Sequence, residues 1–251
     1  MAIVEIRDKS RIAHLFDGWD ETMIWSCLQD CMGEAYAEDT ENPRAAQILL
    51  GDFCVFAGEP TEALVRNVLS DSVILVPQNR GWELVIERCY GSQAKRWTRY
   101  ATKKDASAFD VTALRGYVAE LPPQYELRAI DAEIYDAICA LDWAVDLCIN
   151  FDSREHYLTR GLGVVALCDG EIAAGASSYS FYDGGIEIEI DTRRDFRRRG
   201  LATACGAALI LECLARGLYP SWDAHTEASL ALAEKLGYEF SHSYVSYELE
   251  F

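Results

Sequence analysis

The sequence has few basic residues, few histidines and no long apolar run. Of its 251 residues, 23 are Lys or Arg and 41 are Asp or Glu, which gives a formal net charge of −18. Nucleic-acid backbones and anionic membranes repel so acidic a chain, and we expect neither as a partner. The longest uncharged run, residues 200–211, is too short to cross a bilayer. The first residues also lack the apolar core of a signal peptide, so we expect a cytoplasmic protein.

Cysteine pairs and histidine clusters with metal-ligand spacing are also missing. Nine cysteines are present, an odd number without any Cys-x-x-Cys, and most lie in apolar segments. This pattern predicts reduced, buried thiols. Cys27 and Cys31 would share a helix face, but no histidine lies near them in the sequence. We therefore expect no metal site.

The few basic residues are unevenly distributed. Residues 126–251 carry 10 Lys or Arg and 22 Asp or Glu. Half of those ten bases lie within seven positions: Arg193, Arg194, Arg197, Arg198 and Arg199. A solvated surface would scatter them, so the cluster indicates a specific anionic ligand. The acidity elsewhere favours a cationic small-molecule substrate, or it serves only solubility.

The length allows one large domain or two small ones. Half of the residues are hydrophobic and a quarter are charged, which is typical of a globular protein with a sizeable core. Leu121-Pro122-Pro123 is the best candidate for a linker. We expect an N-terminal α+β domain at residues 1–122 and a second domain at residues 123–251.

Turn residues and periodicity predict mixed secondary structure in the N-terminal domain. Residues 82–89 fit a helix or a strand, and the basic and aromatic residues at 90–104 fit an amphipathic strand better than a nucleic-acid site. Thr61 is a candidate helix N-cap. The other expected elements are helices at 10–38, 61–70 and 110–120, and strands at 45–57 and 73–77.

The second domain contains clearer turn signals than the first. Asp169-Gly170 and Asp183-Gly184 lie between apolar runs and predict two-residue hairpin turns. They would join three antiparallel strands at 162–168, 171–181 and 185–192. The other expected elements are a strand at 125–130, helices at 132–147, 153–160, 201–216 and 226–236, a short strand at 220–224, and one or two strands at 240–251.

Residues 185–217 organise this domain. Residues 186–191 alternate isoleucine with acidic residues, the period of a strand with one apolar and one acidic face. The arginine-rich turn follows, and Gly200 opens an apolar helix. A glycine lets backbone N–H groups approach an anion, and a helix start adds about half a positive charge. The turn is therefore a candidate phosphate cradle.

The turn carries a resemblance to a known family. The pattern Arg197-x-x-Gly200-x-Ala202 resembles the acetyl-CoA signature of the GNAT N-acetyltransferases, and the flanking hairpins and helix fit that family. Ser229-Leu-Ala-Leu-Ala-Glu-Lys-Leu-Gly-Tyr238 is similar to the family's second motif. The two-part chain resembles the subgroup named for zwittermicin A resistance acetyltransferases. Three roles stay open for the N-terminal domain: a degenerate GNAT-like copy, a substrate lid or a dimer surface.

The resemblance implies an α+β fold with a mixed, mainly antiparallel central sheet flanked by helices. It implies acetyl-CoA as cofactor, with its pantetheine arm where the strand ending at Thr192 separates from the next strand. The pyrophosphate would lie on backbone N–H groups of residues 197–202. The implied cofactor-binding residues are Ile190, Asp191, Thr192, Arg197, Arg198, Arg199, Gly200, Leu201, Ala202 and Ser229.

Acetyl transfer to an amine requires a general base, because roughly one lysine-like amine in a thousand is neutral at pH 7. Members of the family often use a glutamate on the strand before the turn, which makes Glu189 and Glu187 the catalytic candidates. The alternative is that both hold a cationic substrate or face solvent.

The residue that usually acts as general acid in the family is missing. The family's usual general acid is a tyrosine, and the matching position here is Ala233. Ser229, Tyr238 and His225 are the candidate substitutes. Trp222 and Asp223, after the short strand, are candidates for lining the substrate amine pocket.

Three functional hypotheses follow. The leading one is an acetyl-CoA-dependent N-acetyltransferase that acts on the amine of a small molecule, such as an aminated antibiotic or a polyamine-like metabolite, by direct attack on the thioester. Because the usual tyrosine is missing, the second hypothesis is a non-catalytic acyl-CoA-binding or regulatory protein on the same fold. Protein N-acetylation is the third. Whether the chain forms a homodimer is left open.

Overall fold

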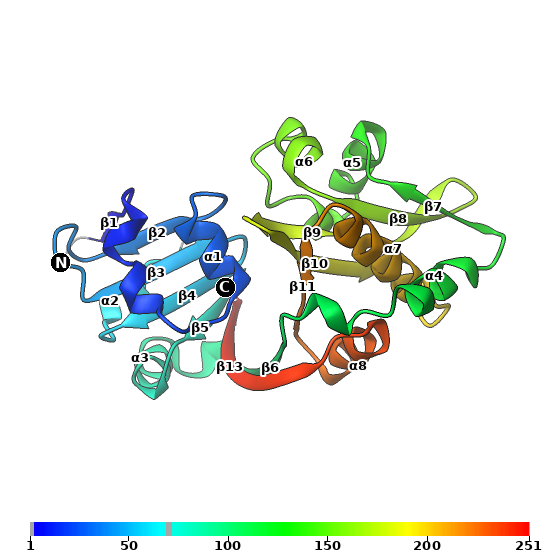
Figure 1. Ribbon diagram of the computed structural model, residues 1–251. Helices are drawn as coiled ribbons and strands as arrows, with labels where there is room; N and C mark the ends of the chain where they lie inside the picture. Colours follow the sequence, from blue (N-terminus) through cyan, green and yellow to red (C-terminus); the bar gives the residue numbers. More distant parts are fainter. Residues whose placement is uncertain (1–2, 69–71, 251) are drawn as a thin grey trace. The chain divides into compact units, whose positions relative to one another are not determined.

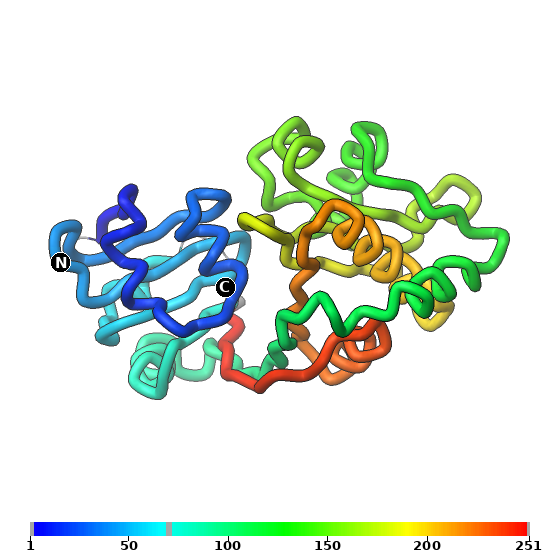
Figure 2. The backbone as a smooth tube through the Cα atoms, in the orientation of Figure 1, coloured from blue at the N-terminus to red at the C-terminus, as the bar shows by residue number. Residues whose placement is uncertain are grey.

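The computed structural model describes residues 3–68 and 72–250, which form two compact units (Figure 1). Unit 1 comprises the described parts of residues 1–99 and 243–251, and unit 2 comprises residues 100–242. The chain passes between them within two strands, β6 (Ala94–Thr102) and β13 (Phe240–Glu250). Figure 2 shows the red C-terminal segment returning to the blue and cyan N-terminal part.

This division differs from the boundary expected after residue 122. Helix α4 (Val111–Ala119) packs on α7 (Leu201–Ala215) and so lies in unit 2. At the other end of the chain, residues 247–250 of β13 pair with residues 72–75 of β5 (Ser72–Pro77) in unit 1. Both contacts join segments that are far apart in the sequence, which a linker-based prediction does not detect.

The sheet of unit 1 contains β1, β2, β3, β4, β5 and β13 in that order. Neighbouring strands are antiparallel except β4 and β5, which are parallel. The remaining elements of unit 1 are β1 (Val4–Glu5), η1 (Lys9–Arg11), η2 (Ala13–Phe16), α1 (Thr22–Leu28), β2 (Glu34–Ala37), β3 (Ala45–Leu50), β4 (Phe53–Gly58), α2 (Glu62–Val65), α3 (Arg80–Tyr90) and η3 (Gly91–Gln93).

Several expectations for this unit are confirmed and others are wrong. Thr61 is an N-cap, and its hydroxyl accepts a hydrogen bond from the N–H of Leu64 at 3.3 Å. The helix it begins is short, however, and residues 69–70 of the expected helix lie outside the described residues. The single strand expected at 45–57 is a hairpin, because Gly51 adopts a left-handed φ of 58° and reverses the chain. Residues 10–38 hold short helical turns and a strand instead of one helix.

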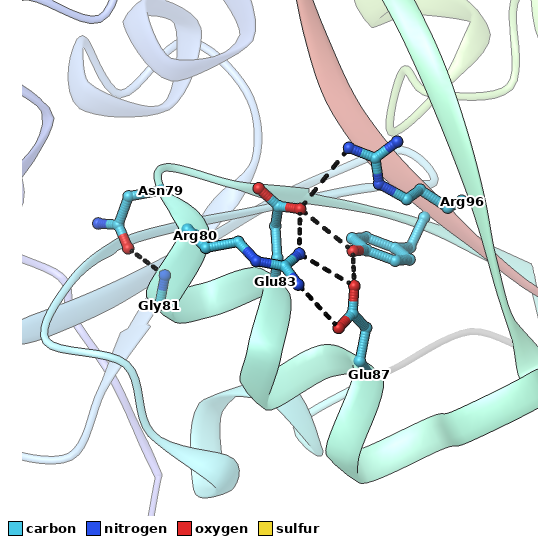
Figure 3. Close-up of polar contacts among 7 residues, drawn as sticks. Asn79, Arg80, Gly81, Glu83, Glu87 and Arg96 are labelled. Carbon is cyan, nitrogen blue, oxygen red and sulfur yellow. Dashed lines mark hydrogen bonds and ion pairs between the residues drawn. The ribbon is translucent and has the colours of Figure 1, made fainter.

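Helix α3 covers the sheet of unit 1 with an apolar face and carries charges on its other face. Trp82 is fully buried, and its ring stacks on Phe56 with centroids 5.0 Å apart. On the outer face Arg80 donates to Glu83 (2.7 Å) and Glu87 (3.1 Å), as Figure 3 shows. Arg96 of β6 pairs with Glu83 at 3.8 Å. This network ties α3 to the strand that follows it.

The main sheet of unit 2 has the order β11-β10-β9-β8-β7. All neighbours are antiparallel except β10 and β11, which are parallel. A separate two-residue ladder joins β12 to β6. The other helices and strands of unit 2 are η4 (Ala106–Ala108), β7 (Tyr125–Ala129), α5 (Ala132–Cys139), η5 (Val145–Leu147), α6 (Arg154–Arg160), β8 (Gly163–Cys168), β9 (Glu171–Tyr182), β10 (Gly185–Thr192), η6 (Arg194–Phe196), β11 (Tyr219–Ser221), β12 (Asp223–Ala224) and α8 (Glu227–Leu236).

The expectations for unit 2 are largely confirmed. Both Asp-Gly pairs form two-residue turns, with Asp169 at φ 53° and Gly170 at φ 83°. Thr226 caps α8, and Gly237 ends it with a left-handed φ of 108°. The helix expected at 132–147 is wrong in length, since α5 ends at Cys139 and a 3-10 turn follows at 145–147. The α+β architecture with a mainly antiparallel sheet is confirmed.

Helix α7 lies across one face of the unit 2 sheet (Figure 1). A methyl group at Gly206 of α7 would come within 3.2 Å of Ile190 and 2.9 Å of Leu236. The glycine therefore lets α7 approach β10 and α8 closely. The opposite face is covered by α6, whose Tyr157 hydroxyl is hydrogen-bonded to Ser177 of β9 at 2.6 Å. The apolar and acidic faces predicted for β10 thus have different neighbours.

The two units repeat one succession of elements. In each, four strands pair antiparallel in sequence order, and helical segments lie between the first and second strands. A two-residue hairpin joins the third strand to the fourth, a helix follows, and a fifth strand pairs parallel to the fourth. Thus β1–β5 correspond to β7–β11, α2 corresponds to α7, and α3 corresponds to α8.

All nine cysteines are free thiols, and five of them are buried. Burial raises the pKa of the Cys54 thiol, and the pKa of Cys205 rises to about 12 for the same reason. Buried thiols of this kind behave as small apolar side chains. Among the described helices, none has the length and apolar character needed to span a membrane.

Candidate active site

The parallel strand pair of unit 2 opens after three residues. Residues 185–187 of β10 pair with residues 219–221 of β11. Within the described residues, the rest of β10 has no partner on that side, because β12 turns to pair with β6. The backbone of residues 188–192 is therefore open along one edge. This is the separation that the family resemblance implies for the strand ending at Thr192.

Glu187 lies where the two strands part. Its side chain is 4% exposed, and its Oε1 accepts a hydrogen bond from the N–H of Asp223 at 2.7 Å. A carboxylate that accepts a backbone N–H makes a strong, charge-assisted bond. Glu187 therefore holds the start of β12 at the point where pairing with β10 stops.

Glu189 lies two residues further along the same face of β10. It is half-buried, and its Oε1 accepts from the N–H of Ile190 at 3.1 Å. Its cross-strand partner is Ser177, which is bonded to Tyr157. The carboxylate of Glu189 is thus hydrogen-bonded to a backbone N–H group in the part of β10 that does not pair with β11.

Asp191 is the third acidic residue on this face. Burial, together with the nearby carboxylate of Asp146 in η5, raises the pKa of Asp191 to about 6, while Arg197 lowers it. The carboxyl group therefore changes its protonation state near pH 6. Its neighbour Asp146 was not among the residues predicted from the sequence.

The arginines of the turn have different surroundings. Arg193 donates to Asp195 (2.8 Å) and Glu171 (3.0 Å), and Arg199 donates to the carbonyl of Asp195 (2.8 Å). The Arg197 Nε donates to the carbonyl of Thr192 at 3.3 Å. Arg193 is half-buried, and the other four arginines are exposed. Arg193, Arg197 and Arg199 shape the turn through these hydrogen bonds.

The turn has the backbone of an anion site. Arg198 and Gly200 both adopt left-handed conformations, with φ of 64° and 83°. Gly200 is the N-cap of α7 and offers no side-chain cap, so the first N–H groups of the helix lack an intrahelical acceptor. A Cβ at Gly200 would meet nothing within 4 Å. The space, the N–H groups and the positive charge all fit a phosphate group.

The candidates on the acid side differ in accessibility. Trp222 is buried, and its Nε1 donates to the Ser229 Oγ at 3.2 Å. Tyr238 is also buried, and its hydroxyl donates to the carbonyl of Pro220 at 2.5 Å. Burial raises the pKa of Tyr238 well above its usual value. Ala233, a residue of α8, is fully buried. Ser229 is half-buried, and because Trp222 is only a donor, the Ser229 proton is directed elsewhere.

Two polar residues of this region were not anticipated from any local pattern. Ser180 of β9 is the cross-strand partner of Glu187, and Asp146 contributes to the raised pKa of Asp191. Register and tertiary contact, which periodicity does not report, bring each of them to the strand. Of the predicted residues, the structure gathers Glu187 and Asp223 into direct contact, and likewise Trp222 and Ser229.

Comparison with known proteins agrees with this geometry. The model of the GNAT acetyltransferase family matches residues 13–247. The chain belongs to the GNAT acetyltransferase family. It is thus a GNAT-type N-acetyltransferase, a family that generally uses acetyl-CoA.

Three relatives illustrate the extent of the GNAT likeness. The crystal structure of a GCN5-related N-acetyltransferase-like protein from Streptococcus suis 89/1591 is 46% identical and has a TM-score of 0.93, covering 97% of this chain and 98% of that chain. The protein named Uncharacterized N-acetyltransferase YdfB from Bacillus subtilis (strain 168) is 24% identical over 98% of this chain and 99% of its own length. A tandem GNAT protein from the clavulanic acid biosynthesis pathway has a TM-score of 0.59 at 12% identity, over 99% of this chain and 98% of that chain.

Proposed function

We propose that this GNAT protein transfers an acetyl group from acetyl-CoA to the amine of a small molecule. The observation that carries the proposal is the opening of β10 from β11 after residue 187, followed directly by the anion site at residues 197–202. An open strand edge offers hydrogen bonds to an amide-containing arm, and the helix start offers them to phosphates.

Acetyl-CoA supplies the activated acetyl thioester, and residues of unit 2 would hold it. The N–H groups at 197–202 would hold the pyrophosphate, with the guanidinium groups of Arg197, Arg198 and Arg199 around it. The backbone of residues 190–192 would bind the pantetheine arm, in contact with Leu201, Ala202 and Ser229. Because the Ile190 N–H is engaged by Glu189, an arm that takes this N–H would release the carboxylate of Glu189.

We propose Glu189 as the general base and Glu187 as a second acidic group at the amine. Glu189 is half-buried and accepts a hydrogen bond from the Ile190 N–H, which the coenzyme arm would bind. Glu187 instead accepts a hydrogen bond from the N–H of Asp223. The two carboxylates lie on one face of the strand, about 7 Å apart along it. A released carboxylate near the thioester would accept the proton of the attacking amine.

On the acid side, we propose that the Ser229 hydroxyl donates a hydrogen bond to the leaving thiolate, which takes its proton from solvent. Its oxygen is fixed by Trp222, which leaves its hydrogen for a partner in the opening. Tyr238 then has a positioning role, since its hydroxyl is committed to Pro220. An unperturbed thiol has a pKa near 8.5, so a weak acid suffices at this step.

The acceptor is proposed to be a cationic small molecule, because the strand face at the opening is acidic. A finer proposal places the protein in the zwittermicin A resistance subgroup, with an aminated antibiotic as acceptor and Asp223 at its amine. We further propose that unit 1 is a degenerate copy of unit 2, which the shared succession of strands supports.

The proposal is tested with purified full-length protein, acetyl-CoA and a panel of primary amines and aminated antibiotics, following thiol release. We expect thiol release that depends on one class of amine. Tight binding of acetyl-CoA without thiol release on any amine would instead support a non-catalytic acyl-CoA-binding protein. Release only with peptides would support protein N-acetylation.

The role of the base is tested by Glu189→Gln, which keeps the size of the side chain and removes its charge. We expect kcat to fall by about 100-fold or more, because general-base catalysis contributes roughly 10²–10⁴-fold. Acetyl-CoA affinity should stay within about twofold. Glu126→Gln, on an exposed position of β7 in the same sheet, is the matched control and should leave kcat unchanged.

A further inference from the structure

Ser180 is a buried hydroxyl without a hydrogen-bond partner among the described residues. Its side chain is fully buried, and its Oγ is not satisfied by any described group. The nearby serines of β9 differ: the Ser177 Oγ is bonded to Tyr157, and the Ser178 Oγ accepts from the N–H of Leu162 at 2.9 Å. An unsatisfied buried hydroxyl costs free energy, which indicates that a group outside the chain completes it.

The register of the sheet places Ser180 beside an acidic group. Ser180 is directly opposite Glu187 in the antiparallel pair of β9 and β10. Residues directly opposite point to the same face and are close enough for their side chains to interact. Glu187 is the last residue of β10 that pairs with β11, so the two side chains lie where the strand pair opens.

The fold itself does not require polar residues at these two positions. Counted from the two-residue hairpins, Ser180 and Glu187 of unit 2 correspond to Ile48 and Val55 of unit 1. Ile48 and Val55 are also directly paired, and both are buried. The same strand pair is therefore satisfied by apolar side chains where no opening follows.

We propose that Ser180 and Glu187 form the subsite that binds the nitrogen of the acceptor amine. The Ser180 hydroxyl accepts a hydrogen bond from the nitrogen, and the Glu187 carboxylate balances the charge of the incoming ammonium group. Ser180 is thus a substrate-binding residue of unit 2, and the ligand class is a primary amine on a small, unhindered carbon, since the pair is buried. This inference rests on the proposed acetyl transfer to a small amine.

The test compares Ser180→Ala with Ser178→Ala in the full-length protein, using the best amine of the panel. For Ser180→Ala we expect the KM of the amine to rise about tenfold or more, because a hydrogen bond to a charged group is lost. The dissociation constant of acetyl-CoA should stay within twofold. The melting temperature should be unchanged or higher, since an unsatisfied hydroxyl has been removed.

Ser178→Ala is the matched control, because it removes a buried hydroxyl that already has its partners in Leu162. We expect a lower melting temperature and an amine KM within twofold of the wild type. An amine KM that is unchanged in Ser180→Ala would overturn the proposal. So would a loss of acetyl-CoA affinity as large as the rise in KM, since Ser180 would then act on the coenzyme side.

The same variants separate this inference from the proposed function. If no amine is acetylated by the wild type, binding of propylammonium chloride is measured by calorimetry, with sodium chloride as the salt control. Binding to the wild type that is at least tenfold weaker in Ser180→Ala supports the subsite even without acetyl transfer. Equal binding by both proteins, or no binding by either, refutes it.

Discussion

Units 1 and 2 contain the same succession of five strands, and they differ at the parallel pair that ends it. In unit 2, only the first three residues of β10 pair with β11. In unit 1, four residues of β4, 53–56, pair with residues 74–77 of β5. Residues 188–192 of β10 extend beyond its parallel ladder, whereas only residues 57–58 of β4 do so.

In unit 1, side chains form hydrogen bonds to the end of β4, beyond the residues that pair with β5. The N–H of Gly58 donates to the Gln78 Oε1 at 3.1 Å, and the Trp82 Nε1 donates to the carbonyl of Gly58 at 3.1 Å. The amide of Gln78 also donates to the carbonyl of Leu15 at 2.7 Å. The end of β4 is thus bonded to other residues of unit 1, whereas among the described residues no strand pairs with residues 188–192 of β10 on the corresponding side.

The N-termini of helices α2 and α7 also differ between the two units. Helix α2 is four residues long, is capped by Thr61, and carries Glu62 in its first turn, and Glu59 of the preceding turn pairs with Arg44. Helix α7 has fifteen residues, a glycine N-cap and a turn rich in arginine. Since acidic groups repel phosphate and a capped helix has fewer free N–H groups, the start of α7 suits a phosphate group better than the start of α2 does.

The contrast teaches that the two units share the order of their strands and differ in the side chains at the end of the parallel pair. The positions of Glu187 and Glu189 correspond to Val55 and Ala57 in unit 1, both of them buried. Apolar residues contribute to the buried core at these positions of unit 1, and acidic residues take their place in unit 2.

The largest effect is expected from Trp82→Ala in unit 1. Removing a fully buried tryptophan that stacks on Phe56 and bonds to Gly58 should lower the free energy of unfolding by about 3–5 kcal/mol. Urea unfolding followed by circular dichroism measures it. Acetyl-CoA affinity of the folded protein should be unchanged. A large loss of affinity in the folded variant would mean that unit 1 takes part in coenzyme binding.

The next effect concerns the anion site of unit 2. Gly200→Glu places a carboxylate where the pyrophosphate would bind, and we expect acetyl-CoA affinity to fall more than 100-fold, about 2.7 kcal/mol. Calorimetric titration measures the affinity. Gly217→Glu is the control, because Gly217 has a similar φ of 71° and equal open space beyond the C-terminal end of the same helix. Comparable losses in both variants would attribute the effect to backbone strain.

Asp191→Asn is expected to have a smaller, pH-dependent effect. The pKa of Asp191 is raised from 3.8 to about 6, mainly by burial, so its ionised form destabilises the fold above about pH 6. As the pH falls towards 4, the folded state takes up the proton first and this penalty disappears. The variant should therefore be more stable than the wild type by about 1–2 kcal/mol at pH 8, a figure reduced for solvent screening.

Urea unfolding at pH 8 and pH 4 tests this prediction, with the low-pH comparison as an internal control. At pH 4 the two proteins should differ little, because Asp191 is protonated in the folded state. A stabilisation that is equal at both pH values would contradict an origin in the charge of Asp191.

The smallest effect is expected from Arg198→Gly, which removes an exposed guanidinium and keeps a residue that tolerates the left-handed φ of 64°. Acetyl-CoA affinity should fall about three- to tenfold, and the loss should shrink at high salt, as for an exposed charge. Arg66→Ala, an exposed arginine at the C-cap of α2 in unit 1, should change the affinity less than twofold.

Local chemistry explains which elements could be predicted. The Asp-Gly turns, the Thr61 cap and the alternating strand at 185–192 depend on neighbouring residues alone, and all of them formed as expected. The hairpin at Gly51 was missed because apolar residues on both sides of it form one continuous run. The acidic strand and arginine turn were also found from local pattern, as was the family.

The sequence by itself determined the family, the turns and the acidic strand that leads to Gly200, because each follows from the φ preferences and polarity of adjacent residues. Only the tertiary structure decided that unit 1 repeats the topology of unit 2, that β13 ends in unit 1, and that Glu187 bonds to Asp223. It also decided that Ser180 faces Glu187 and that Asp146 faces Asp191. These relations depend on strand register and on burial, which join residues distant in the chain and leave no local pattern in its sequence.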